Sequence, residues 1–396
     1  MTISASTRCR SAAHRSQFSA LSVAPIVFAL VVFTFSSSWL LVAQVNSEGA
    51  ATIIPPAASK GIVSGPTPTT LSLAASSTMN VASEMGGAFK SGSKCDAEGN
   101  LYIPKFALDR PLLGPVVKID PDGKPTARFD PSAFSKLALH RADGFSPASD
   151  GGLYQIAESE NLQDGVSKRR IYVLHFSSDG SPSSPTLLDA DFEVYTFAAF
   201  AGGNFLVSGV HRDLQKNAQN NSDQGRNFSA VFSADGRELA ELSFKNTAVK
   251  DVPGNSKATA KTPVGTDAPS PTLDLADAEV GSDGNLYVMR SSAPAVIYVI
   301  SPSGEIMKTL KIAVPLAGAI PNTFHISGNR MALSYATGES QTFVVVDAQT
   351  GKQIASYGDP GGLGPSFACY SANDGVFTFL KLGEANELEV IRAAVQ

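Results

Sequence analysis

Short apolar runs alternate with tight polar turns through most of the chain, and this pattern is clearest between residues 278 and 310. There, the apolar runs 286–289 and 296–300 are rich in β-branched and aromatic residues, which favour strands. The sequence Asp283-Gly284-Asn285 is typical of a tight turn between antiparallel strands, because these residues accept a positive φ. The second run is continuously apolar, as expected of a strand that is covered on both faces. The segment therefore predicts one four-stranded antiparallel sheet.

The same elements recur along the chain at steps of about 44 to 52 residues, which is the spacing of propeller blades. Copies of the turn with the second strand lie at 98–102, 150–154, 202–206, 283–287, 327–331 and 373–377. Copies of the third strand with its turn lie at 116–124, 171–180, 229–237, 296–304 and 342–352. One longer step contains 251–272, a Pro-, Gly- and Ser-rich run that we interpret as a solvated insertion. The repeats predict an all-β fold, a six-bladed β-propeller with four-stranded antiparallel blades.

The sixth copy is incomplete, because only one more strand, at 388–393, follows its second strand. An N-terminal strand can supply the missing outer strand, and residues 69–75 are the best candidate. Pairing of this kind closes the ring and removes an open sheet edge. We therefore expect a linker at 46–85 that includes the closing strand, followed by the propeller at 86–396.

The first 45 residues combine a basic start with a long uncharged apolar run. Arg8, Arg10 and Arg15 precede the apolar stretch 21–35, which is typical of an export signal. The uncharged stretch is also long enough to be an N-terminal membrane anchor. Under either alternative, we expect the rest of the chain to be extracytoplasmic, whether secreted, periplasmic or membrane-anchored and facing outward.

The segment 357–367 (YGDPGGLGPSF) resembles the Gly-rich link between blades in NHL-type propellers. The Gly-Asn-Leu-Tyr copies at 99–102 and 284–287 resemble the same superfamily, which includes lactonase-like and lyase-like six-bladed propellers. The resemblance covers about residues 86–396, and it implies a fold rather than a chemistry. In lactonase-like and lyase-like relatives, acidic, amide or His side chains at the channel mouth hold a divalent cation.

The charge of the chain and its cysteines limit which partners and which cysteine pairing we expect. The chain has 31 Lys and Arg against 36 Asp and Glu, and its net charge of −5 disfavours nucleic acid as a partner. We expect a monomer that binds a protein, peptide or glycan. Cys9 lies in the leader, which leaves Cys95 and Cys369 on the inner strands of blades one and six. Because these blades become neighbours when the ring closes, the pair forms either a disulfide or two buried thiols.

The links between blades, and those between the second and third strands, are longer than the other turns, so we expect function on the face that carries them. We call this the loop face. Its candidate binding residues are His140, Arg141, Asp143, Asp277 and His325.

Three residues, Glu158, His211 and Arg290, hold corresponding places in successive blades and are candidate catalytic residues at the channel mouth. Glu158 and His211 are also candidate metal ligands, because carboxylate and imidazole groups bind divalent cations that activate water. The alternative for all these loop residues is that they are ordinary solvated charges.

Two functions remain open on this basis. The sequence lacks G-x-S-x-G, H-E-x-x-H and C-x-x-C motifs, which favours a binding or scaffold propeller that contacts a protein, peptide or glycan through its loop face. The alternative is a metal-dependent hydrolase or lyase with its site at the channel mouth. No cofactor other than such a divalent cation is indicated.

Overall fold

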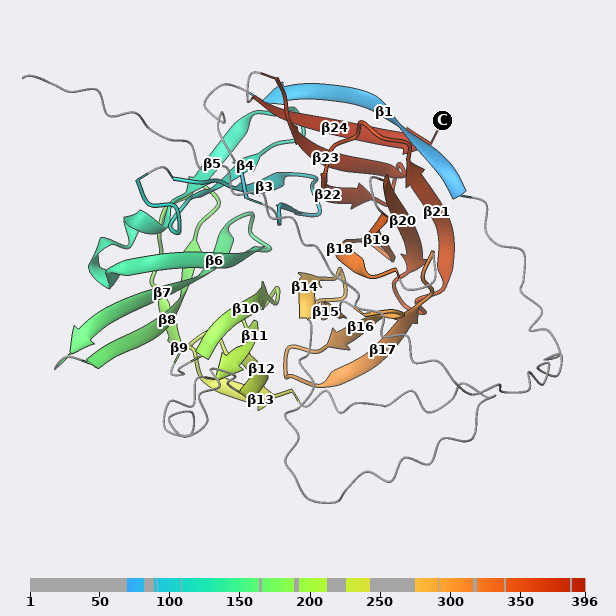
Figure 1. Ribbon diagram of the computed structural model, residues 1–396. Helices are drawn as coiled ribbons and strands as arrows, with labels where there is room; N and C mark the ends of the chain where they lie inside the picture. Colours follow the sequence, from blue (N-terminus) through green and yellow to red (C-terminus); the bar gives the residue numbers. More distant parts are fainter. Residues whose placement is uncertain are drawn as a thin grey trace, which may run out of the picture. The chain divides into compact units, whose positions relative to one another are not determined.

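Strands joined by tight turns form a ring of blades, which a computed structural model shows in Figure 1. The structure describes residues 70–81, 89–90, 92–107, 109–163, 166–188, 192–211, 226–242, 275–290, 292–315, 319–337, 340–384 and 387–395. The predicted leader at 1–45 lies outside these residues. No helix within the described ranges is long and apolar enough to cross a membrane.

The chain builds each blade from the ring axis outwards, one antiparallel strand after another. The strands of blades one and two are β2 (Lys94–Cys95), β3 (Leu101–Pro104), β4 (Val116–Ile119), β5 (Pro125–Phe129), β6 (Leu139–Pro147), β7 (Leu153–Gln163), β8 (Val166–Phe176) and β9 (Thr186–Leu188). Those of blades three and four are β10 (Phe192–Ala199), β11 (Phe205–His211), β12 (Arg226–Phe232), β13 (Glu238–Glu241), β14 (Leu275–Val280), β15 (Leu286–Arg290), β16 (Ala295–Ile300) and β17 (Ile306–Ile312).

Blades five and six share a single eight-stranded sheet. Their strands are β18 (Pro321–Ser327), β19 (Arg330–Thr337), β20 (Ser340–Asp347), β21 (Gln353–Asp359), β22 (Ser366–Ser371), β23 (Val376–Leu382) and β24 (Leu388–Val395), with β1 (Thr70–Val81) between β21 and β24. The ring therefore has six blades, and the all-β propeller predicted from the repeats is confirmed.

The turn chemistry of the repeats explains where the strands lie. In blade four, β15 and β16 coincide with the two predicted apolar runs, and Gly284 between β14 and β15 has a φ of +78°. Glycine adopts such a φ at the least steric cost, so the Asp-Gly copies favour the hairpins and with them the register of each blade.

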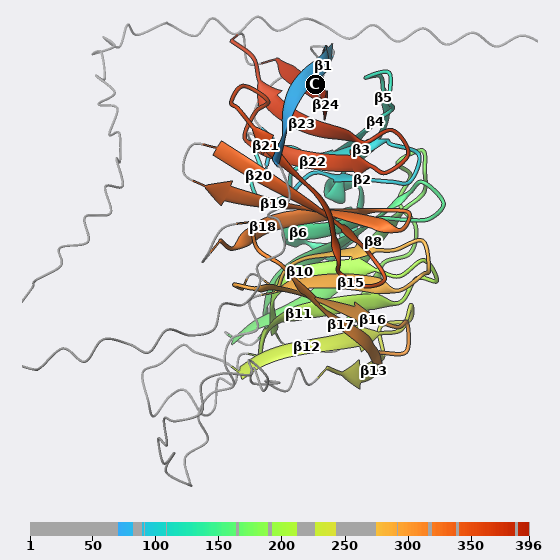
Figure 2. The same ribbon diagram turned by 90° about the vertical axis from the view of Figure 1, so that its right-hand side faces the viewer.

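The ring is closed by β1, which fills the place of the missing outer strand of blade six (Figures 1 and 2). It pairs antiparallel with β24 from Leu73 to Val81 and parallel with β21 from Thr70 to Ser72. The predicted N-terminal closing strand is thus confirmed, although β1 continues to Val81, beyond the expected end at residue 75. Leu73 is fully buried in the cluster that contains Phe343, Phe367 and Phe377.

Apolar side chains between adjacent blades form the core. Blades four and five share a cluster that includes Met289, Phe324 and Leu333, and blades two and three share one that includes Ile156 and Phe197. Burial of these side chains is the main favourable term holding one blade against the next.

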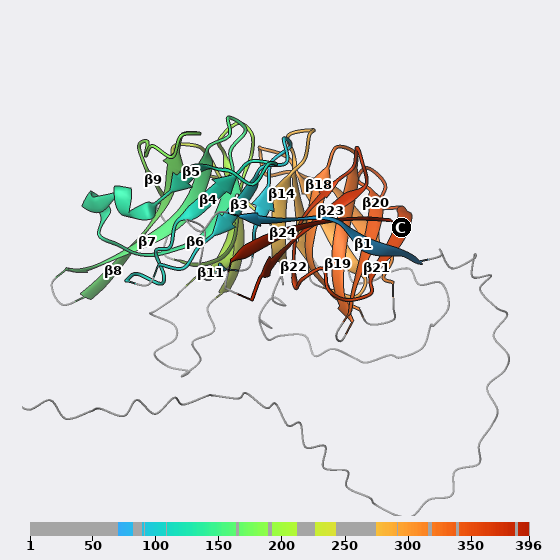
Figure 3. The same cartoon turned by 90° about the horizontal axis from the view of Figure 1, so that it is seen from above.

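The loop face is the less regular of the two faces. The link between blades one and two contains two 3₁₀ turns, η2 (Pro131–Ala133) and η3 (Ser135–Leu137). Among the described residues, β7 and β8 form the longest hairpin, and Figure 3 shows it projecting beyond its neighbours. Through these two features, blade two projects at the loop face.

Replacement of Leu73 by Ala tests the closing role of β1. We expect Leu73→Ala to lower the free energy of unfolding by about 2–5 kcal/mol, because it leaves a cavity beneath the strand that closes the ring. Chemical denaturation followed by circular dichroism measures this difference.

Leu71→Ala is the matched control, since Leu71 lies on the same strand but is exposed. It is expected to change stability by less than about 0.5 kcal/mol. Equal effects of the two substitutions would contradict the role assigned to β1.

Candidate binding site

The inner strands around the ring axis share an irregularity, a β-bulge in the part of the strand nearer the loop face. The register between the first and second strands shifts in β6, β10, β14, β18 and β22. The extra residue at each shift is His140, Tyr195, Ala276, Asn322 and Ala368, respectively, and β6 has a second shift between Ala142 and Phe145. Bulges re-aim side chains and are common beside functional sites.

Three of these bulge residues are exposed. Tyr195 is 66% exposed although Val194 and Thr196 on either side of it are buried, and Ala276 and Asn322 are exposed in the same way. The inner strands β10, β14 and β18 flank one another around the ring. The exposed bulge residues are therefore open towards the axis rather than towards a neighbouring blade.

Hydrogen bonds between inner strands set these three residues in a row. The Thr196 hydroxyl donates to the Leu275 carbonyl at 2.8 Å, so Tyr195 and Ala276 are each next to one end of this bond. The Thr323 hydroxyl donates to Asp277 Oδ2 at 2.8 Å, and Ala276 and Asn322 flank this second bond in the same way. We call Tyr195, Ala276 and Asn322 the axial row.

A glycine permits the bulge that exposes the tyrosine. Gly209 on β11 pairs with Val194, and a Cβ atom at Gly209 would lie 1.8 Å from the Glu193 carbonyl oxygen. Any side chain there would force the two strands apart. The backbone of blade three is thus built for this irregularity.

Blade two carries charged groups on its inner strand β6, which flanks β10. The Arg141 guanidinium forms an ion pair with the Asp143 carboxylate, and both side chains are about one-third exposed. Burial raises the pKa of the Asp143 carboxyl, and Arg141 only partly offsets this effect. A Cβ atom at Gly144 would lie 3.0 Å from the Phe197 Cβ atom, so β6 and β10 approach each other closely at these two residues.

Glu158 lies in blade two opposite Arg141 in the register of β6 and β7. Its side chain is only 4% exposed, and its Oε2 atom is 3.8 Å from His140 Nε2 and 4.0 Å from Arg169 Nη1. Within the described part of the chain, Glu158 Oε1 and His140 Nδ1 have no hydrogen-bond partner. Buried polar atoms normally find partners, so this cluster has hydrogen-bonding capacity left for water or a ligand.

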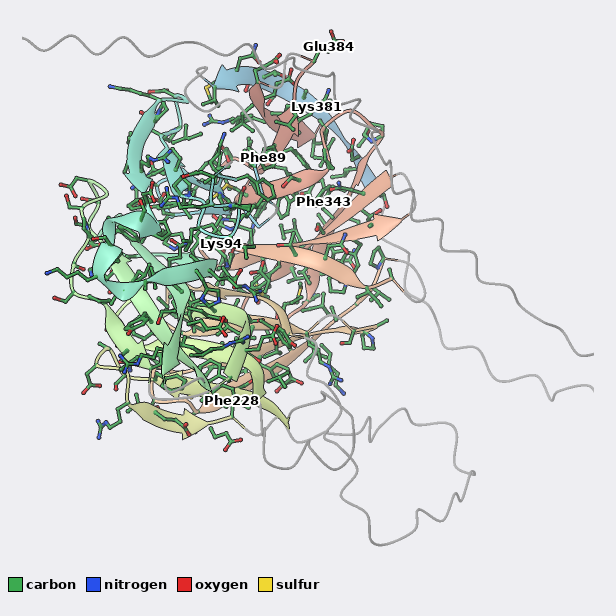
Figure 4. The ribbon with its side chains drawn as sticks, turned by 60° about the vertical axis from the view of Figure 1, so that its left-hand side comes forward. Phe89, Lys94, Phe228, Phe343, Lys381 and Glu384 are labelled. Carbon is green, nitrogen blue, oxygen red and sulfur yellow. A yellow bond between two sulfur atoms is a disulfide. The ribbon has the colours of Figure 1, made fainter. Side chains whose placement is uncertain are left out.

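Lys94, which Figure 4 labels, reaches from blade one to blade four, the opposite blade in a ring of six. Its Nζ atom donates to Asp277 Oδ1 at 3.0 Å and to the Ala278 carbonyl at 2.8 Å. The Lys94 and Asp277 side chains are 13% and 18% exposed. Burial disfavours the charged ammonium, but Asp277 and Glu279 outweigh burial and raise the pKa of Lys94.

A second polar rung joins blades four and five, two residues further along β14 and β18. His325 Nδ1 lies 3.0 Å from Glu279 Oε2, which also accepts the Ile326 N–H at 2.9 Å. Burial disfavours the Glu279 carboxylate, but His325 and Lys94 stabilise it and lower the pKa of Glu279. We call Lys94, Asp277, Glu279, Thr323 and His325 the axial floor. Each of its charged groups has a partner within the floor.

A disulfide joins Cys95 of β2 to Cys369 of β22, with 6.0 Å between the Cα atoms. The alternative of two buried thiols is thereby excluded. Strand β2 consists only of Lys94 and Cys95 and pairs with two residues of β3. The disulfide therefore anchors the short strand that carries Lys94 across the axis.

The structure brings some of the sequence-predicted residues together and leaves others apart. Asp277 and His325 lie in the axial floor, whereas His140, Arg141, Asp143 and Glu158 lie together in blade two. Arg290 ends β15, and its Nε atom has no hydrogen-bond partner among the described residues.

His211 ends β11, but its side chain lies outside those that the structure describes. No contact between described side chains joins Glu158 to Arg290. Among the described residues, no three His, Cys, Asp or Glu side chains are grouped so that they suit a metal ion.

Sequence reasoning missed Lys94, Thr323, Tyr195 and Asn322. Lys94 directly precedes a cysteine that the closed ring brings to the axis, which is a usable signal. The bulges have no such signal, because one extra residue in a strand leaves the apolar pattern nearly unchanged.

No protein-family model matches the sequence, and a search of curated proteins finds no match either. Many solved structures are similar to this chain. The PQQ-bound aldose sugar dehydrogenase from Streptomyces coelicolor is 11% identical, covers 84% of this chain and 100% of its own, and has a TM-score of 0.42.

The β-propeller domain of Myceliophthora thermophila Cps50 (Swd1) is 9% identical over 82% of this chain and 100% of its own, with a TM-score of 0.44. The Neurospora crassa Pan2 WD40 domain is 10% identical over 83% of this chain and 95% of its own, with a TM-score of 0.39. None of these likenesses bears on what this chain binds or does.

Removal of the Lys94 charge tests the axial floor. We expect Lys94→Met to lower the free energy of unfolding by about 3–5 kcal/mol, because it leaves the buried Asp277 carboxylate without its cation. Chemical denaturation at neutral pH measures the loss. The double variant Lys94→Met with Asp277→Asn should recover part of it.

Lys311→Met is the matched control, since Lys311 is exposed on the outer strand of blade four. It should alter stability by no more than about 0.5 kcal/mol. If Lys94→Met behaves like this control, the bridge across the axis is not a stabilising contact.

Proposed function

We propose that this protein is an exported propeller that binds a partner molecule at its loop face, around the ring axis. One observation carries the proposal. Three adjacent inner strands each present an exposed bulge residue at the axis, whereas the polar groups of the floor beneath them are paired with one another. A rigid base under a row of exposed side chains suits recognition.

The floor itself favours binding over catalysis. A general acid or base must come within hydrogen-bonding reach of its substrate. The side chains of Lys94, Glu279 and His325 are less than one-sixth exposed and are bonded within the floor. Their arrangement supports a structural role that holds the axial row in place.

The alternative, a metal-dependent hydrolase or lyase, would require Glu158, His211 and Arg290 to converge on the axis. Glu158 instead faces His140 and Arg169 within blade two. No contact in the described part of the chain favours this alternative.

The disulfide supports the extracytoplasmic location, because disulfides persist mainly in oxidising compartments. An export signal or membrane anchor at 1–45 and a linker from residue 46 belong to the same proposal. So does an NHL-like relationship, which rests on the Gly-rich link before β22, where Gly361, Gly362 and Gly364 all have positive φ.

Site-specific photo-crosslinking tests the proposed function. The full-length chain, with a benzophenone-bearing residue in place of Asn322 or Ala276, is expressed in cells of the source organism and irradiated. We expect a covalent adduct with another molecule at both positions, because both are exposed at the axis.

The control carries the same photoreactive group at Met307, which is exposed on the outer strand β17. It should give no such adduct. Adducts that form equally at Met307, or at none of the three positions, would refute binding at the axis.

A further inference from the structure

The axial row has a chemistry that narrows the class of ligand. Tyr195 presents an aromatic ring on an inner strand whose neighbouring residues are almost fully buried. Burial of a large side chain of this kind against a neighbouring blade would gain about 1.5–3 kcal/mol. The fold forgoes this gain, so the ring is available for contact with another molecule.

On one side of the Tyr195 aromatic ring, the next bulge residue is small and the one after it is polar. Ala276 on the next strand has only a methyl group, so no bulky side chain from that position covers the flank of Tyr195. Asn322 follows on β18, and its amide both donates and accepts hydrogen bonds.

On the other flank of β10, the neighbouring inner strand β6 carries the partly exposed Arg141–Asp143 ion pair. Its guanidinium donates and its carboxylate accepts, so this flank also offers both kinds of hydrogen-bonding group. The row thus consists of one apolar ring with mixed donors and acceptors on both sides.

The charges near the row are largely balanced. Arg141 is paired with Asp143, and Lys94 is paired with Asp277 below the row. No net charge is left at these pairs to select a strongly anionic or cationic ligand.

We propose that the axial row binds a neutral saccharide, which places an apolar sugar face on the Tyr195 ring and hydroxyls against Asn322 and the Arg141–Asp143 pair. A sugar hydroxyl, like the Asn322 amide, both donates and accepts, and a pyranose ring has an apolar C–H face that matches an aromatic ring. This inference rests on the proposed binding function and names its ligand class.

A peptide fits the row less well. Extended peptides bind through the open edge of a strand, and proline-rich ones through grooves lined by several aromatic rings. The axial row contains a single aromatic side chain, and its polar groups come from side chains.

Binding of the full-length chain to a panel of neutral and acidic oligosaccharides, followed by titration with the best neutral one, tests the inference. Tyr195→Ala should weaken binding about tenfold or more, because it removes the stacking surface. Tyr195→Phe, which keeps the ring, should stay within about threefold of the unaltered chain. Asn322→Ala should weaken binding several-fold, whereas Met307→Ala on the outer strand should have no effect.

The outcomes separate this inference from the proposed function. If no neutral saccharide binds, or if Tyr195→Ala leaves saccharide binding unchanged, the ligand class is wrong. Photo-crosslinks from Asn322 to a peptide or protein would then still support a binding site at the axis. If the crosslinks are absent as well, both proposals fall together. Tyr195 is exposed, so thermal melting of the variants should match that of the unaltered chain and exclude misfolding.

Discussion

A ring of blades is stable only if its first and last blades are held together, and in this protein that constraint is met at two depths, with a further contact across the axis. At the rim, β1 adds an N-terminal strand to the sheet of blade six. Nearer the axis, the disulfide joins blade one to blade six. At the axis itself, Lys94 reaches from blade one to Asp277 in blade four. Because β2 contains only two residues, the covalent bond at Cys95 and the ion pair at Lys94 hold the same short strand, so each contact limits the movement of the other.

The contacts at the closed axis lie beneath the side chains that the loop face exposes. Beneath that face, the polar groups of blades four and five are bonded in two rungs, Asp277 with Thr323 and Glu279 with His325. Next to the first rung, the bulges in β14 and β18 expose Ala276 and Asn322. Buried, mutually satisfied charges thus support exposed, chemically mixed side chains. If the axial row binds a ligand as proposed, this arrangement separates stability from recognition, because the row and the floor consist of different residues.

The strands and the ring closure could be predicted because turn residues and apolar runs are local signals. The end of β1 at Val81 could not, since four of the residues 76–80 (Ser-Ser-Thr-Met-Asn) are polar and the segment has the composition of a linker. Asp277 and His325 were predicted on the loop face because they lie where the chain enters blades four and five, and the structure pairs them within the axial floor. The bridge made by Lys94 depends on how far apart opposite blades lie after the ring closes, which no local pattern encodes. The exposure of Tyr195 likewise follows from a register shift that the sequence does not reveal.

The most direct measurement is a double-mutant cycle between the disulfide and the axial bridge. Free energies of unfolding are compared for the unaltered chain, Lys94→Met, the pair Cys95→Ala with Cys369→Ala, and all three changes together. If the disulfide holds β2 so that Lys94 reaches Asp277, the loss caused by Lys94→Met shrinks by about 1–3 kcal/mol once the disulfide is removed. Losses that add within about 0.5 kcal/mol would mean that the two contacts act independently, and that the axis is not closed by one coupled strand.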